Sequence, residues 1–221
     1  MSHRVGADGL TPELLLRAYA AGIFPMAEGR DDPDVFWVDP RMRGVLPLDG
    51  VHVPRSLRKT MRQDRFEVRC DADFRSVVRA CAARARGRDE TWINHSIEDA
   101  VIGLHDMGFA HSMECWRGGE LVGGLYGIAL RGAFFGESMF SRETDASKVA
   151  LMHLVARLRL GRFRLLDTQF VTNHLERFGV VEIPARVYLE ELERALDAQC
   201  VFPVAADDGA IRAELATISH R

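Results

Sequence analysis

Residues 134–141 read Phe-Phe-Gly-Glu-Ser-Met-Phe-Ser, and residues 165–169 read Leu-Leu-Asp-Thr-Gln. Each stretch begins with apolar residues at the density of a buried strand and continues into a carboxylate or an amide. The residues between them have a helical pattern, so both strands can lie in one sheet. Glu137, Asp167 and Gln169 are then expected to emerge close together at the end of that sheet, with Asp167 and Gln169 on one face.

The chemistry of these side chains leaves two interpretations open. Carboxylates near the end of a strand can position an amine and accept its proton. Alternatively, Glu137 and Asp167 cap helices or belong to ion pairs, which is the commoner role of an isolated carboxylate.

The pattern along the rest of the chain predicts an α+β protein with a central mixed sheet. We expect a small N-terminal α/β domain at residues 1–42 and a larger domain at 43–221. The predicted elements are a helix from the N-cap Thr11 to Gly22, helices over 54–65, 73–86 and 96–108, a hairpin over 110–117 and 120–130, a strand over 133–139, a helix over 146–160, a strand over 163–170 and a helix over 184–198. Ser96 with Asp99 resembles a capping box, and Asp145 stands where an N-cap is expected.

The composition is typical of a globular protein. The chain has 221 residues, of which 47% are hydrophobic and 28% charged, and its net charge is −3. Contact with nucleic acid would therefore have to come from a local basic patch. Because no run approaches the length of a membrane span and the first residues have no apolar signal core, we expect a cytoplasmic protein that does not interact with membranes.

The cysteine and histidine spacings predict no metal site. Cys70, Cys81, Cys115 and Cys200 fit neither a zinc site nor a redox pair, and the histidines show no His-Glu-x-x-His pattern. We expect four free thiols.

One stretch concentrates positive charge. Arg55, Arg58, Lys59 and Arg62 recur at spacings of three and four, which places them on one face of a helix. Such a face is often simply solvated. In a chain of net negative charge, however, the concentration indicates a site for phosphates.

A series of motifs resembles the leucyl/phenylalanyl-tRNA–protein transferase family, over about Gly6 to Leu196. The motifs are, in chain order, Gly22-Ile-Phe-Pro25, Asp39-Pro-Arg41, Thr91-Trp-Ile93, His111-Ser112, Glu120-Leu-Val-Gly-Gly124, Tyr126-Gly127, Gly136-Glu-Ser-Met-Phe-Ser141, Ala146-Ser-Lys148, Asp167-x-Gln169 and Glu182-Ile-Pro184. The hexapeptide together with Asp-x-Gln is the most specific part. The resemblance implies that the larger domain has the fold of acetyl-coenzyme A-dependent N-acetyltransferases.

The resemblance also implies an activity. Members of this family move Leu or Phe, and Met less well, from aminoacyl-tRNA to the α-amine of proteins that begin with Arg or Lys. The added residue marks those proteins for N-degron proteolysis. The aminoacyl ester is already activated, so no cofactor is expected, and the chain has no phosphate-binding Gly-x-x-x-x-Gly-Lys motif.

By motif match, the resemblance assigns roles to residues of this chain. Asp167 holds and deprotonates the incoming amine, directly or through Gln169, and Glu137 orients the amine or the ribose end of the donor. The sequence does not decide which group takes the proton. Trp92 is expected to stack on the terminal adenosine, while Met26 and Val101 stand where the family commonly has aromatic residues.

The remaining assignments concern the donor. The resemblance implies a pocket for its side chain at Leu125, Phe134, Leu154 and Leu158, although any one of these can also be ordinary core. It implies that the basic helix with Arg55, Arg58, Lys59 and Arg62 binds the acceptor stem of the tRNA.

Two other functions are kept as alternatives. An acetyl-coenzyme A-dependent N-acetyltransferase would need a glycine-rich turn for the pyrophosphate, whereas residues 141–145 read Ser-Arg-Glu-Thr-Asp. A non-catalytic RNA-binding module would gain nothing from a carboxylate cluster, because carboxylates repel phosphates. Dependence on aminoacyl-tRNA or on acetyl-coenzyme A separates the first two functions, and transfer activity itself separates the third.

Overall fold

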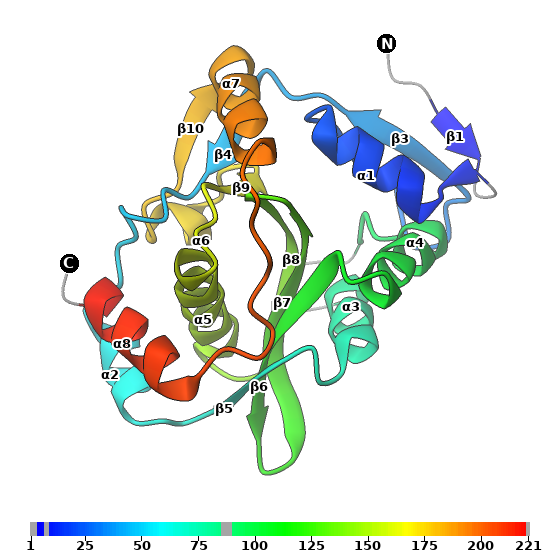
Figure 1. Cartoon of the computed structure of the whole chain (residues 1–221). Coiled ribbons are helices and arrows are strands. Elements are labelled where there is room, and N and C mark those ends of the chain that lie inside the picture. Colours follow the sequence, from blue (N-terminus) through cyan, green and yellow to red (C-terminus); the bar gives the residue numbers. More distant parts are fainter. Residues whose placement is uncertain (1–3, 7–8, 85–89, 220–221) are drawn as a thin grey trace.

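The computed structural model describes residues 4–6, 9–84 and 90–219, which form two sheets with helices around them (Figure 1). The strands are β1 (Arg4–Gly6), β2 (Phe24–Met26), β3 (Asp34–Val38), β4 (Met42–Val45), β5 (Glu67–Cys70), β6 (Ala110–Arg117), β7 (Glu120–Leu130), β8 (Ala133–Ser141), β9 (Leu165–Gln169) and β10 (Val181–Pro184). The helices are α1 (Pro12–Ala20), α2 (Arg55–Arg62), α3 (Phe74–Ala82), α4 (His95–Asp106), α5 (Ala146–Leu160), α6 (Asn173–Glu176), α7 (Ala185–Leu196) and α8 (Asp208–Ser219).

The N-terminal part contains helix α1 and a small antiparallel sheet in the order β1-β3-β2. As predicted, Thr11 caps α1 by accepting a hydrogen bond from the backbone N–H of Leu14, and Pro12 follows at the first helical position. The chain leaves the helix through Gly22, whose φ of 81° lies in the left-handed region.

The second sheet has seven strands in the order β10-β4-β9-β8-β7-β6-β5. Strands β8 and β9 run parallel, and every other neighbouring pair is antiparallel. The predicted mixed sheet of an α+β protein is therefore confirmed. Helix α5 supplies the crossover between β8 and β9, as the helical pattern between the two opening stretches predicts.

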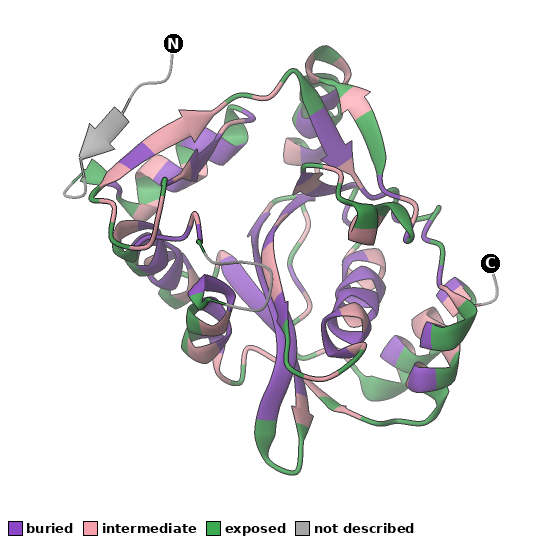
Figure 2. Ribbon diagram, turned by 180° about the vertical axis from the view of Figure 1, so that it is seen from behind, coloured by how far each residue is buried: buried purple, intermediate pink, exposed green. Residues whose placement is uncertain are grey.

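The central strands of this sheet are buried on both faces. Successive strand residues point to opposite sides of the sheet, and an apolar cluster covers each side. Phe134 packs with helix α5 in one apolar cluster, while its neighbour Phe135 packs with helix α3 in the other. Figure 2 shows that the long central strands are buried over most of their length. The site described below depends on this double-sided burial.

The N-terminal part shares its apolar core with the larger sheet. Leu15, Tyr19 and Phe24 belong to the same buried cluster as Phe135 and Leu165. Along the chain, the first strand that belongs to the seven-stranded sheet is β4, at residues 42–45. A domain division near residue 42 stays a prediction, as does the detailed likeness to N-acetyltransferases.

Three local predictions need correction. Helix α4 is capped by Asn94, not Ser96, since the Asn94 side chain accepts from the Ile97 N–H while its amide donates to the Asp32 carbonyl. Helix α3 ends at Ala82; positions 85 and 86 of the predicted helix lie outside the described residues. Asp145 precedes α5 with a φ of 72° and makes no side-chain cap.

The prediction also missed elements that tertiary contacts stabilise. The edge strands β5 and β10 are short and half-exposed, so they carry little apolar pattern. Helix α8 lies against α5 and buries Ile211 and Ile218. Among the helices of the described ranges, none combines the length and the apolar character needed to cross a membrane.

Candidate active site

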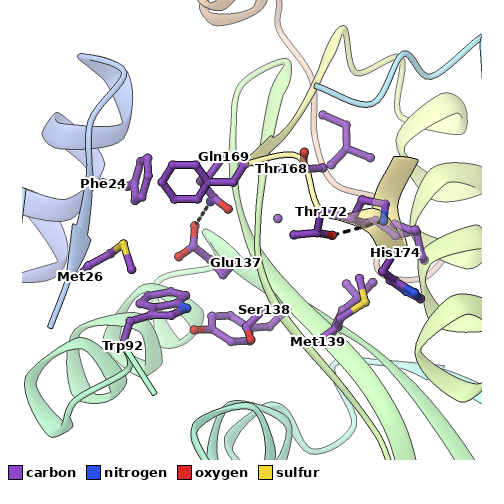
Figure 3. Close-up of a pocket in the computed structure, with 18 residues that line it drawn as sticks. Phe24, Met26, Trp92, Glu137, Ser138, Met139, Thr168, Gln169, Thr172 and His174 are labelled. Carbon is purple, nitrogen blue, oxygen red and sulfur yellow. Dashed lines mark hydrogen bonds between the residues drawn. The ribbon is translucent and has the colours of Figure 1, made fainter. Parts of the chain in front are cut away.

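The site lies where strands β8 and β9 separate. They pair only from Ala133–Leu165 to Phe135–Asp167, although β8 continues to Ser141. The gap opens into a largely apolar pocket of about 330 Å³ (Figure 3). Its wall comprises Phe24, Met26, Trp92, Leu125, Tyr126, Gly136, Glu137, Ser138, Met139, Leu151, Leu154, Leu166, Thr168, Gln169, Phe170, Thr172, His174 and Leu175.

The structure brings five of the eight proposed catalytic and substrate-binding residues to this wall. They are Trp92, Leu125, Glu137, Leu154 and Gln169. The other three, Phe134, Leu158 and Asp167, are fully buried outside it. Phe134 and Leu158 belong to the same buried apolar cluster as the wall residues Leu125 and Leu154.

Glu137 and Gln169 are joined across the gap. The side-chain Nε2 of Gln169 donates a hydrogen bond of 2.9 Å to Oε1 of Glu137. Gln169 has a φ of 56°, so strand β9 ends there in a left-handed turn. A Cβ on Gly44 would lie 2.8 Å from the Phe170 backbone, so only glycine at that position lets β4 lie so close to this turn.

Asp167 is held behind the pocket by a network that leaves its carboxylate no exposed surface. Arg43 donates from Nε to both carboxylate oxygens at 3.0 Å and from Nη2 at 2.7 Å. The Tyr188 hydroxyl and the Gln169 backbone N–H each donate at 2.7 Å. Asp167 thus meets the pocket wall through its contact with Gln169, and its part in the reaction stays a prediction.

The environment of Glu137 changes its acidity. Burial, with the negative charge of Asp167 as a smaller cause, raises the pKa of Glu137 to about 8, although Tyr19, Arg43 and Gln169 act in the opposite direction. Burial together with the neighbouring Glu137 also raises the pKa of Tyr19, which keeps its hydroxyl protonated. Glu137 is thus a carboxyl group that can gain or lose a proton near neutral pH.

Aromatic side chains line the side of the pocket next to the small sheet. Trp92 and Met26 lie together there, and Phe24 meets Phe170 edge to face with ring centroids 5.6 Å apart (Figure 3). Val101 is buried in the core and does not reach the wall. The sequence analysis assigned no role to Phe24 or Phe170, because an apolar residue of the wall and one of the core look alike in a sequence.

The basic residues of α2 lie outside the pocket. Arg55, Lys59 and Arg62 are exposed, whereas Arg58 is half-buried and donates from Nε to the Val53 carbonyl. In place of a helix cap, the Asp145 carboxylate accepts from the Thr60 hydroxyl at 3.0 Å and so ties α2 to the start of α5.

Arg43 and Tyr188 were also missed by the sequence analysis. They are among the largest fully buried side chains of the described residues. Nothing in the local pattern separates Arg43 from the exposed arginines around it. Its role depends on Asp167, which lies far along the chain.

The described part of the chain holds no group of three or more His, Cys, Asp or Glu side chains arranged for a metal ion. The four cysteines are free thiols. Burial raises the pKa of Cys70 and of Cys115 to about 12, which makes both poor nucleophiles at neutral pH.

Comparison with known proteins identifies the family of the chain. The family described as leucyl/phenylalanyl-tRNA protein transferase matches residues 45–193, and its N-terminal domain matches residues 8–41. Proteins named leucyl/phenylalanyl-tRNA–protein transferase from Paramagnetospirillum magneticum and Rhodospirillum rubrum are 60% and 58% identical to the chain, over 85% and 90% of its length and 90% and 93% of theirs. One from Phenylobacterium zucineum is 61% identical over 85% of both. The chain belongs to the leucyl/phenylalanyl-tRNA–protein transferase family.

Proposed function

We propose that this protein transfers Leu or Phe, and Met less well, from aminoacyl-tRNA to the α-amine of proteins that begin with Arg or Lys. The transfer marks these proteins for N-degron proteolysis in the cytoplasm and needs no cofactor. Membership of the family supports the reaction class. The observation that carries the proposal is the hydrogen bond between Gln169 and Glu137 on the wall of an apolar pocket.

The chemistry follows from that pair. The α-amine attacks the ester carbonyl carbon of the donor, a C–N bond forms, and the carbonyl oxygen becomes an oxyanion. Glu137 takes the proton that the attacking nitrogen must lose and returns it to the ribose oxygen as the C–O bond breaks. A pKa of about 8 suits a group that both accepts and donates a proton near neutral pH.

Gln169 and Asp167 have distinct parts in this proposal. Gln169 holds Glu137 with its Nε2 and offers its carbonyl oxygen to the incoming amine. Asp167 is a positioning residue: it fixes the turn at Gln169 through the backbone N–H, and Arg43 and Tyr188 fix Asp167. The reaction proceeds directly, with no covalent enzyme intermediate.

The pocket supplies the donor selection. Trp92 offers a stacking surface for the terminal adenosine. Leu125 and Leu154, with Leu151 also on the wall, accept an apolar side chain that is unbranched at Cβ. Phe134 and Leu158 belong to the apolar cluster that contains these leucines. Strict exclusion of Val and Ile needs a steric fit, because one methylene in an apolar pocket discriminates by only about 1–3 kcal/mol.

Leu154→Ala is expected to loosen this selection and admit bulkier or β-branched donor side chains, because the smaller side chain enlarges the pocket. Leu158→Ala is the matched control, since Leu158 lies outside the wall. It is expected to cost about 2–5 kcal/mol of folding stability and to leave the donor ratio unchanged. Relative kcat/KM values for Leu-, Phe- and Ile-tRNA measure the effect. Equal ratios in Leu154→Ala and the parent would make Leu154 ordinary core.

The basic helix α2 is proposed to contact the acceptor stem through Arg55, Arg58, Lys59 and Arg62. The double variant Lys59→Ala, Arg62→Ala is expected to weaken the binding of all donor tRNAs about equally. The slope of log K against log salt concentration should become shallower by about one unit, or somewhat less, for each lost contact. Binding measured across a salt series tests this. An unchanged affinity and an unchanged salt slope would show that these residues of α2 do not bind tRNA.

One experiment separates this function from its alternatives. The protein is incubated with a peptide that begins with Arg and with either labelled Phe-tRNA or labelled acetyl-coenzyme A. Label should reach the peptide from Phe-tRNA alone. Label from acetyl-coenzyme A would indicate an N-acetyltransferase, and tRNA binding without label transfer would indicate an RNA-binding module.

A further inference from the structure

Besides Glu137 and Gln169, the pocket has further polar side chains. Thr172 and His174 lie on the side opposite Trp92 and Met26 (Figure 3). His174 lines the pocket, and its Nε2 is buried with no hydrogen-bond partner among the residues that the structure describes. A buried ring nitrogen without a partner is costly unless a ligand satisfies it. This atom is not used by the transfer chemistry above.

Two cations flank His174. Lys148 lies one helical turn before Leu151, on the α5 face that borders the pocket. Arg177 follows His174 by one turn at the end of α6; it is exposed and, within the described ranges, has no carboxylate partner. Burial lowers the pKa of His174, and the positive charges of Lys148 and Arg177 lower it further. The lowered pKa favours the uncharged ring, which carries one N–H that can donate.

These side chains connect the pocket with the basic helix. Asp145 accepts from Lys148 Nζ at 2.7 Å and from the Thr60 hydroxyl of α2 at 3.0 Å. Asp145 offsets one positive charge, so Lys148 and Arg177 together still leave a net positive charge beside the pocket. Lys148 thus lies between the exposed cations of α2 and the pocket mouth.

We propose that Lys148, His174 and Arg177 bind the phosphate that links the last two nucleotides of the donor, an inference that rests on the function proposed above. The guanidinium and the ammonium group supply charge, and the imidazole N–H donates to a phosphate oxygen. When the adenosine is stacked on Trp92 across the pocket, the nucleotide chain of the donor leaves the pocket toward α2.

The test compares two short donors that carry the same amino acid. Phenylalanyl-adenosine has no phosphate, and the phenylalanylated dinucleotide CpA has one. The parent should use the CpA donor about tenfold better or more, the size expected of charge-assisted hydrogen bonds to one phosphate. Lys148→Ala and Arg177→Ala should each lose most of that advantage and keep the parent's rate with phenylalanyl-adenosine. His174→Ala should also lose most of the advantage; because His174 lines the pocket, its effect is read only as the ratio of the two donors.

The comparison contains its own controls. Arg186→Ala removes an exposed arginine from α7 and should keep the full advantage of CpA. The inference is overturned if the parent uses both donors equally, or if the three variants retain the parent's preference. Were the parent to transfer from neither donor while a related transferase did so, the proposed function itself would fall and the inference with it. Because Arg177 is exposed, its replacement is expected to leave folding intact, and this variant keeps the test valid.

Discussion

Glu137→Gln is expected to lower turnover by about a hundredfold or more while leaving the affinity for donor tRNA close to that of the parent. The substitution removes the group that takes the amine proton, and general acid–base catalysis contributes about 10²–10⁴-fold. It keeps the side-chain volume and an oxygen that can accept from Gln169. Single-turnover rates at saturating tRNA, together with a binding isotherm, measure the two quantities separately.

The same variant is expected to be more stable than the parent at pH 8 and above. Because the pKa of Glu137 is raised from its ordinary value of 4.5 to about 8 in the folded protein, the folded state holds a proton that the unfolded state releases. The contribution of this carboxyl group to stability is therefore fully present at low pH and is lost as the pH rises through about 8. Glutamine carries no such charge, so the gain at pH 8 and above should be on the order of 2 kcal/mol or more.

Glu143→Gln provides the matched control, because Glu143 lies just beyond β8 and outside the pocket wall. It should change neither turnover nor the pH dependence of stability by much. If Glu137→Gln kept the parent's turnover, another group would have to accept the proton. If it slowed turnover yet lost stability at pH 8, Glu137 would be a structural residue whose removal disturbs the site.

The second large effect concerns the buried pair of Arg43 and Asp167. Arg43→Met is expected to cost about 3–5 kcal/mol of folding stability, because it leaves the Asp167 carboxylate buried without its cation. The double variant Arg43→Met, Asp167→Asn should recover much of that loss, since neither charge then remains. Denaturant unfolding of both variants and of Asp167→Asn completes the cycle.

Two further measurements accompany this cycle. Arg186→Met breaks an exposed pair with Glu190 and should cost less than about 1 kcal/mol, which controls for the loss of any arginine. In Asp167→Asn the rising limb of the rate against pH should move to lower pH, because the charge of Asp167 is one cause of the raised pKa of Glu137. Stability losses that simply add in the double variant would contradict the coupling of Arg43 and Asp167. A pH dependence of the rate that stays the same in Asp167→Asn would contradict the positioning role of Asp167.

The sequence predicted the central part of the fold well because local and tertiary preferences agree there. The hairpin of β6 and β7, strand β8, helix α5 and strand β9 are long apolar segments bounded by turn or capping residues, and they position Glu137 and Gln169. The same reasoning missed β10 and α8, whose residues are largely exposed and become ordered by packing on other elements. It also chose Ser96 over Asn94 as a helix cap, because only the tertiary partner at Asp32 distinguishes the two.

The site was predictable only in part, for a related reason. Motif residues such as Glu137 stand out in a sequence, whereas Arg43 and Tyr188 act through a partner that is distant along the chain. The division of the leucines into wall and core depends on which side of a helix or strand meets the gap between β8 and β9. No local pattern encodes that gap, because it arises where two strands stop pairing.

The most direct measurement is the mass and the site of modification of an Arg-initiated peptide after incubation with the protein and Phe-tRNA. The account predicts that the peptide gains one phenylalanine residue, joined through its α-amine, and that Ile-tRNA gives no product. A peptide of unchanged mass, under conditions in which the protein binds Phe-tRNA, would contradict the account, as would phenylalanine attached to a lysine side chain.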